Sequence, residues 1–205
     1  FVRHWSSHIN DSLPLIEEAF AVTRKAHDPI YGAYLLSMAV LVHFYSGRKL
    51  GEVLEAQNRV IEHCRPYPME GVVAFSEPYA AATRALMGET SSLSDLSSAD
   101  FDLSDYKRRF SNLPMVMGLL CGAHIQLLTL AGEHEQAIAM ADDDNIRISP
   151  PFISLVPIRF WSGFSYAKLA QRLPIGSAEY AKFVDGLQES LNFLQIVHDS
   201  GSIEN

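Results

Sequence analysis

The chain has 205 residues, of which 48% are hydrophobic and 20% are charged, and its formal net charge is −8. This composition is typical of a folded globular protein and differs from that of a disordered chain. The negative charge argues against nucleic acid as a partner, because nucleic-acid binding needs a basic face, and against a polybasic membrane anchor. No apolar run reaches the length of a bilayer-spanning helix, so we expect no membrane partner.

The two cysteines, Cys64 and Cys121, lie far apart in the chain and form no CxxC pair. Their number and spacing argue against a disulfide framework and favour a reducing, cytoplasmic environment. The chain begins with Phe1 and shows no pattern of a secretory leader. We therefore expect residues 1–205 to be a single helical-repeat segment excised from a longer protein.

Apolar residues recur with helical spacing along the chain, and the polar–apolar alternation of strands is scarce. Asn10, Asp11 and Ser12 offer N-cap oxygens to a first helix that ends near residue 25, and Pro29 suits the first turn of the next helix. Further helices are expected at residues 30–45, 50–63, 69–87, 106–110, 113–131, 134–142, 153–171 and 178–198. The serine- and aspartate-rich residues 89–105 are expected to form a long loop, and loops of this length tend to be functional or mobile.

The sequence LLTLAGEHEQAIAMAD at residues 127–142 predicts two antiparallel helices joined by a short turn. Gly132 stands where a helix C-terminus favours a residue that tolerates positive φ, and Ala137 and Ala141 let the two helices approach closely. The succession of such pairs predicts an all-α fold, a tetratricopeptide-like α–α superhelix of stacked antiparallel helix pairs. No strict period of about 34 residues can be counted, so the units are irregular.

The order of small motifs is more specific than any single motif. It runs through His4-Trp5, His27-Asp28-Pro29, FYSGRKL at residues 44–50, Leu86-Met87-Gly88 and LAGEHEQA at residues 130–137. Over residues 1–171 this succession resembles the helical-repeat region of very large multidomain signalling proteins. In that family a serine/threonine-kinase-like domain and an AAA-type (STAND-like) ATPase domain come first, and GAF or PAS sensor domains and a histidine kinase follow the repeats.

The resemblance implies a role in two-component signal transduction for the full-length protein, which would be an ATP-dependent histidine or serine/threonine kinase. The catalytic segments of that family would then lie outside residues 1–205. The implied partners are the neighbouring ATPase and sensor or kinase domains of the same chain, or a separate protein or peptide. The histidine kinase context also favours a homodimer.

Motifs that carry chemistry are incomplete in this chain. His134-Glu135 opens like the zinc-protease motif HExxH, but Ile138 replaces the second histidine, so we expect a surface or capping role for both residues. Ser165 stands in a sequence similar to a nucleophile elbow, yet its neighbours have helical spacing, which places it in the middle of a helix. The run Asp142-Asp143-Asp144-Asn145 is interpreted as a solvated loop. We therefore assign no catalytic, cofactor-binding or metal-binding residue.

On the inner helices, polar and aromatic residues that stand among apolar ones are expected to contact a partner in a binding groove. They are Tyr31, Tyr34, His43, Tyr79, His124 and Gln126. The sequence thus favours a non-catalytic scaffold or regulatory connector that mediates protein–protein or interdomain contacts. The alternative is a small-molecule sensor, similar to the repeat domain of maltose-type transcriptional activators, which would need a pocket with convergent polar groups. A stand-alone helical enzyme would need carboxylates or histidines that face one cavity.

Overall fold

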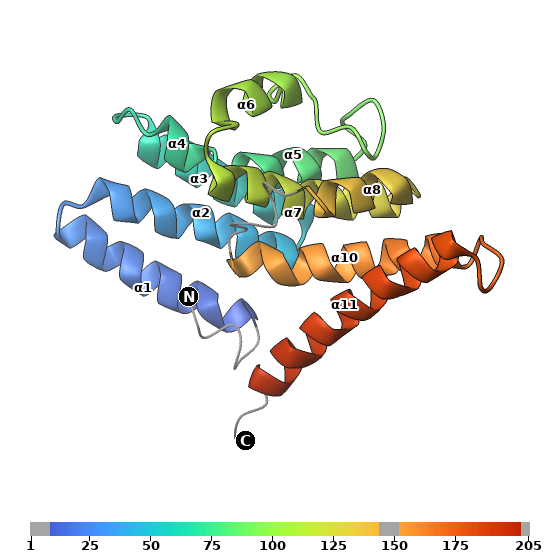
Figure 1. Cartoon of the computed structure of the whole chain (residues 1–205). Coiled ribbons are helices and arrows are strands. Elements are labelled where there is room, and N and C mark those ends of the chain that lie inside the picture. The colour runs from blue at the N-terminus through green and yellow to red at the C-terminus, as the bar shows by residue number, and fades with distance from the viewer. Residues whose placement is uncertain (1–8, 144–151, 202–205) are drawn as a thin grey trace.

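The computed structural model describes residues 9–143 and 152–201, and Figure 1 shows them as an array of helices. No strand forms in these two ranges, so the expected all-α class is confirmed there; an isolated bridge joins Ser98 and Phe101. His4-Trp5 and the expected loop residues 144–151 lie outside the described ranges. The helices are the 3-10 helix Ile9–Asp11, α1 (Ser12–Lys25), α2 (Pro29–Tyr45), α3 (Leu50–Cys64), α4 (Glu70–Val73), α5 (Glu77–Leu86), α6 (Leu103–Phe110), α7 (Pro114–Leu130), α8 (His134–Ala141), α10 (Phe152–Ala170) and α11 (Ala178–Gly201).

The expected single helix over residues 69–87 is wrong, because the chain forms two helices, α4 and α5, with a turn between them. Pro78 in the first turn of α5 explains the break. Proline has no N–H to donate to the carbonyl four residues earlier, and its ring clashes with that carbonyl. The carbonyl concerned, that of Ala74, instead accepts a hydrogen bond of 2.7 Å from the hydroxyl of Tyr106 on α6.

The loop between α5 and α6 ends at Asp102, three residues earlier than expected, because Asp102 caps α6. Its carboxylate accepts a hydrogen bond of 2.9 Å from the backbone N–H of Asp105. The loop does not project into solvent along its whole length, since Leu96 is fully buried and Phe101 is 8% exposed. These two side chains belong to the same core as α2, α3 and α5.

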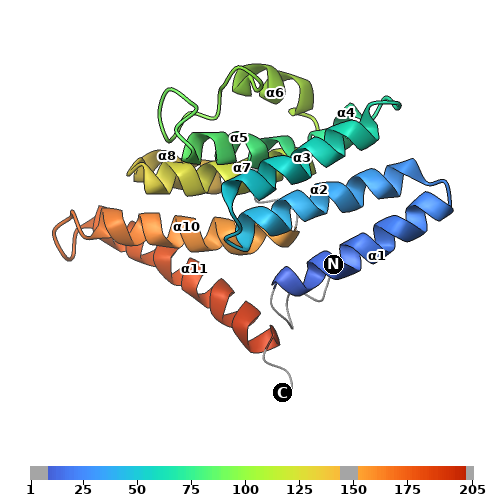
Figure 2. The same ribbon diagram turned by 180° about the vertical axis from the view of Figure 1, so that it is seen from behind.

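The helices pack in a regular order (Figures 1 and 2). Helix α1 packs on α2, and α2 packs on α3. Then α5 contacts both α2 and α3, α7 contacts both α5 and α6, and α10 contacts both α7 and α8. Helix α11 packs on α10. From α5 onward, α5, α7 and α10 therefore each contact two helices that precede them in the chain.

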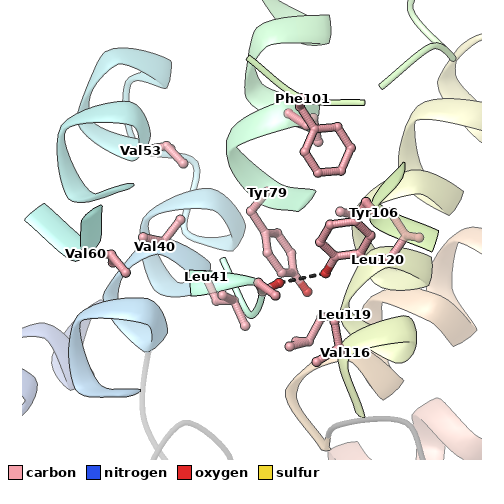
Figure 3. Close-up of a cluster of buried hydrophobic side chains, with 14 of the residues drawn as sticks. Val40, Leu41, Val53, Val60, Tyr79, Phe101, Tyr106, Val116, Leu119 and Leu120 are labelled. Atoms are coloured by element: carbon pink, nitrogen blue, oxygen red, sulfur yellow. Dashed lines mark hydrogen bonds between the residues drawn. The ribbon is translucent and has the colours of Figure 1, made fainter. Parts of the chain in front are cut away.

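The largest core lies between α2, α3, α5 and α7, and Figure 3 shows part of it. Val40, Leu41, Val53, Tyr79 and Leu119 have no exposed surface there. Full burial of a side chain such as leucine or valine stabilises a fold by about 1.5–3 kcal/mol. A second cluster continues the core toward α8 and α10; it contains Cys121, Ile125, Leu128, Ala137 and Ile158.

The turn between α7 and α8 has the expected conformation, with Gly132 at φ +82°. The N–H of Glu133 donates to the carbonyl of Leu128 at 2.9 Å, and the N–H of Gly132 donates to the carbonyl of Thr129 at 3.1 Å. This pair of hydrogen bonds is the Schellman motif, which satisfies carbonyls that the helix itself leaves unpaired. The prediction of a glycine-terminated helix at this position is confirmed.

Helices α10 and α11 approach each other closely at two glycines. A Cβ atom on Gly163 would lie 3.0 Å from Cβ of Ser190, and a Cβ atom on Gly186 would lie 2.6 Å from the ring of Tyr166. The hydroxyl of Tyr166 in turn donates to the carboxylate of Asp142, after the end of α8, at 2.8 and 2.9 Å. The absence of a side chain at Gly186 therefore lets one tyrosine connect α11, α10 and α8.

Candidate binding surfaces

Ser165 and His134 meet in a buried polar cluster between α8 and α10. The Ser165 hydroxyl lies 3.2 Å from Nδ1 of His134 and 3.0 Å from the hydroxyl of Thr129. The prediction that Ser165 lies in the middle of a helix is confirmed, whereas the expected surface position of His134 is wrong, because this side chain is 5% exposed. Ser165 has no exposed surface, so the cluster satisfies buried polar groups and gives a substrate no access to the hydroxyl.

Three of the residues expected to line a groove lie on α2, and they face different neighbours. Tyr31 is 66% exposed near the start of the helix. Tyr34 packs edge-to-face on Phe75, with ring centroids 5.3 Å apart. His43 lies 4.0 Å from the carboxylate of Glu52 on α3. Tyr34 and His43 are nine positions apart, which places them on opposite sides of an α-helix, so these two residues do not line one groove.

Tyr79 lies inside the core and joins three helices through its hydroxyl. It accepts a hydrogen bond of 3.1 Å from the Tyr45 hydroxyl on α2 and lies 3.1 Å from the Ser154 hydroxyl on α10. Burial raises the pKa of Tyr79 to about 12, so it remains a neutral hydrogen-bonding group at physiological pH. Gly122 on α7 completes the junction, because a Cβ atom there would lie 3.1 Å from the Tyr45 hydroxyl.

His124 holds the long loop against α7. Its Nε2 donates a hydrogen bond of 2.8 Å to the carbonyl of Ser94, and the Ser94 hydroxyl donates to the carboxylate of Glu133. Donation from Nε2 leaves Nδ1 unprotonated in the neutral ring, and this buried atom has no partner among the described residues. Gln126, two positions further along α7, is partly buried. The hydrogen bond from His124 to Ser94 thus holds the loop between α5 and α6 against α7.

We expect the folded state to lose stability as the pH falls below 6.5. Desolvation lowers the pKa of His124 below its ordinary value of 6.5, and burial does the same to His43 and His134. The unfolded chain therefore binds protons more readily than the folded chain, so stability is full above 6.5 and decreases toward the lowered pKa values. Urea denaturation at a series of pH values measures this slope. Because glutamine does not titrate, H124Q is expected to have a shallower slope, and an equal slope would contradict the role of His124.

An open pocket of about 290 Å³ lies where the end of α3 meets α4, the start of α5 and α6. Its apolar walls come from Ile61, Tyr67, Met69 and Val73, and buried Cys64 also contributes. The charged residues that line it are Arg65, Glu70, Glu77 and Arg109. The volume is at the lower end of the range for ligand sites, about 300–1,000 Å³, so the pocket suits a group of side-chain size.

Arg109 on α6 is already engaged by carboxylates near the pocket. Its guanidinium donates a hydrogen bond of 3.1 Å to Glu70, lies 3.6 Å from the carboxylate of Asp105, and lies over the Phe110 ring with Cζ 4.8 Å from the centroid. The carboxylate of Glu77, by contrast, makes no hydrogen bond or ion pair with any of the described residues. Desolvation raises the pKa of Glu77, and the charge of Arg109 offsets only part of this effect.

None of the residues expected to line a groove belongs to this pocket. The segment Arg65-Pro66-Tyr67-Pro68 follows the end of α3, and its two prolines and tyrosine form a rigid and partly apolar wall. Glu77 gave no signal of its own, because the other residues that line its pocket come from α3, α4, α6 and the turn after α3. Only the packing of α6 brings Arg109 to the same pocket as Glu77.

Among residues 9–143 and 152–201, no group of three or more histidine, cysteine, aspartate or glutamate side chains is placed to hold a metal ion. Within the same ranges, no helix combines the length and apolar character needed to cross a bilayer. Cys64 and Cys121 are both buried free thiols. No family model, curated protein or solved structure matches the chain.

Proposed function

We propose that this chain is a non-catalytic scaffold or regulatory connector with a tetratricopeptide-like superhelical arrangement, belonging to a multidomain signal-transduction kinase or ATPase in the cytoplasm. The observation that carries the proposal is the packing order, in which α5, α7 and α10 each contact two preceding helices. In a stack of helix pairs, the first helix of each pair packs on both helices of the pair before it. The contacts of α5, α7 and α10 with two preceding helices each support this arrangement.

Such an arrangement suits mechanical connection and recognition. Each unit contacts only its neighbours, so a small change at every interface alters the curvature of the whole stack while each pair stays packed. A stack of this kind can transmit the nucleotide state of a preceding ATPase domain to a following sensor or kinase domain, or present its inner helices to a protein or peptide. Ile30 and Tyr31, which are 52% and 66% exposed at the start of α2, are apolar contact points for such a partner.

A site-specific crosslinking experiment tests the proposal in the full-length protein. A photo-reactive amino acid replaces Tyr31, and a matched variant carries it at Glu55, an exposed position on α3. We expect illumination to link Tyr31 to a neighbouring domain or a partner protein and to leave the Glu55 variant largely unlinked. Equal linking from the two positions, or none from either, would contradict the use of this end of α2 as a contact surface.

The second candidate function is a small-molecule sensor similar to the repeat domain of maltose-type transcriptional activators. The pocket beside α3, α4 and α6 favours it, since it combines apolar walls with charged groups. Thermal melting against a panel of metabolites distinguishes the two functions, because a ligand that binds only the folded state raises the melting temperature. A sensor shows stabilisation by a defined compound, whereas a connector shows none.

A further inference from the structure

The pocket between α3, α4, α5 and α6 contains a carboxylate without a partner. Glu77 is partly buried at the start of α5, and none of the described residues forms a hydrogen bond or ion pair with its carboxylate. Partial removal of a charge from water opposes folding unless another charge or a hydrogen bond compensates for it. The negative charge of Glu77 is therefore not fully compensated by other groups of the protein.

The surrounding residues do not provide that compensation. The guanidinium of Arg109 also lines the pocket, but it is directed to Glu70 and Asp105. Arg65 is exposed, where water and salt screen its charge. The N-terminus of α5 favours a negative charge by about 0.3–1 kcal/mol. Desolvation nevertheless raises the pKa of Glu77, and the charge of Arg109 offsets only part of this effect.

The walls around Glu77 define which cation would fit. Met69 and Val73 offer apolar surface to a hydrocarbon stem, and Tyr67, which is 44% exposed, offers the face of an aromatic ring. A magnesium or calcium ion would need about six or more oxygen ligands, which this pocket lacks. A primary ammonium on an apolar stem matches both features, because the stem packs on the walls while the ammonium donates to the carboxylate.

We propose that this pocket binds an alkylammonium group, with the ammonium at Glu77 and its methylene stem against Tyr67 and Met69. Two sources share this chemistry: the side chain of a lysine in a peptide, and a free diamine. The site is distinct from the exposed start of α2: a lysine side chain as its ligand is compatible with the proposed connector, and a free diamine with the sensor. Its ligand is of side-chain size, in keeping with the volume of about 290 Å³.

Heteronuclear NMR of the full chain with three probes tests the proposal. The probes are N-acetyl-lysine-N-methylamide, 1,5-diaminopentane, and N-acetyl-norleucine-N-methylamide, which has an apolar side chain without a charge. We expect the two ammonium probes to shift the backbone amides of Tyr67, Met69, Glu77 and Arg109, and the norleucine probe to leave them unchanged. Tighter binding of the diamine would identify a free amine as the source, and equal or tighter binding of the lysine probe would identify a side chain.

E77Q removes the charge with little change in shape, and E55Q on the exposed face of α3 is the matched control. A hydrogen bond to a charged group changes an equilibrium by about tenfold or more, so E77Q is expected to bind both ammonium probes at least about tenfold more weakly than the wild type. E55Q is expected to bind as the wild type does. E77Q should not melt at a lower temperature, because it removes a partly buried, unpaired charge.

Two results would overturn the proposal. One is binding of the lysine and norleucine probes with equal affinity, which would mean that the pocket recognises only the stem. The other is unchanged binding of the ammonium probes by E77Q. If E77Q unfolds, the pH dependence of probe binding to the wild type tests the proposal instead. Binding of the ammonium probes that does not weaken as the pH falls and carboxylates become protonated would also refute the role of Glu77.

Discussion

Replacement of Tyr79 by alanine is expected to destabilise the fold by about 3–5 kcal/mol, as truncation of a large buried aromatic side chain does. Tyr79 has no exposed surface and packs edge-to-face on Phe44 and Tyr45, with ring centroids 5.3 and 5.4 Å away. Alanine would leave a cavity and would also remove the hydroxyl partner of Tyr45 and Ser154. Urea denaturation monitored by circular dichroism measures the change in the free energy of unfolding.

Y31A and Y79F are the matched variants for this experiment. Tyr31 is 66% exposed, so its truncation should change stability by no more than about 0.5 kcal/mol. Y79F keeps the ring and removes only the hydroxyl, and the unsatisfied partners should reduce stability by about 1–3 kcal/mol. If Y31A and Y79A lowered stability equally, Tyr79 would not have the buried position described.

Replacement of Gly186 by alanine is expected to reduce stability by about 1–3 kcal/mol, the usual effect of overpacking a close helix contact. The added Cβ would lie 2.6 Å from two ring atoms of Tyr166 and 2.8 Å from a third. The ring has little freedom to move, because its hydroxyl donates to Asp142 and its face packs near Phe183. The free energy of unfolding and the intrinsic fluorescence of the chain report the displacement.

G51A provides the control for G186A. Gly51 lies in α3, and a Cβ atom there would have no neighbour within 4 Å. Alanine favours the helix over glycine by about 0.5–1 kcal/mol, so G51A should leave stability unchanged or raise it slightly. Stabilisation by both substitutions would show that α10 and α11 do not approach as closely at Gly186 as the structure indicates.

The positions of most helices follow from local signals. The cap at Asp28, whose carboxylate accepts from the N–H of Tyr31 at 3.1 Å, and the prolines near helix starts act over one turn of chain. Gly132 ends α7 for the same local reason. Pro78 carried an equally local signal that the interpretation of residues 69–87 as one helix overlooked.

Burial depends on neighbours that are distant in the chain, and here the sequence was less informative. Tyr31 and Tyr79 are both tyrosines in apolar helices, yet one is 66% exposed and the other has no exposed surface. His134 is buried because Ser165, 31 positions away, packs against it. The pattern of apolar residues within α8 does not predict this burial of His134.

Three features can be predicted from local sequence: the all-α class of the described residues, the ends of most helices, and the incomplete zinc-protease-like motif. These properties depend on backbone sterics, capping and helical spacing, which act within about one or two turns. The packing of the helices was needed to show that Tyr79 and His124 are buried, that Tyr34 and His43 contact different neighbours, and that Glu77 shares a pocket with Arg109. Those properties depend on contacts between α-helices far apart in the chain, and the helix ends do not specify which faces will meet.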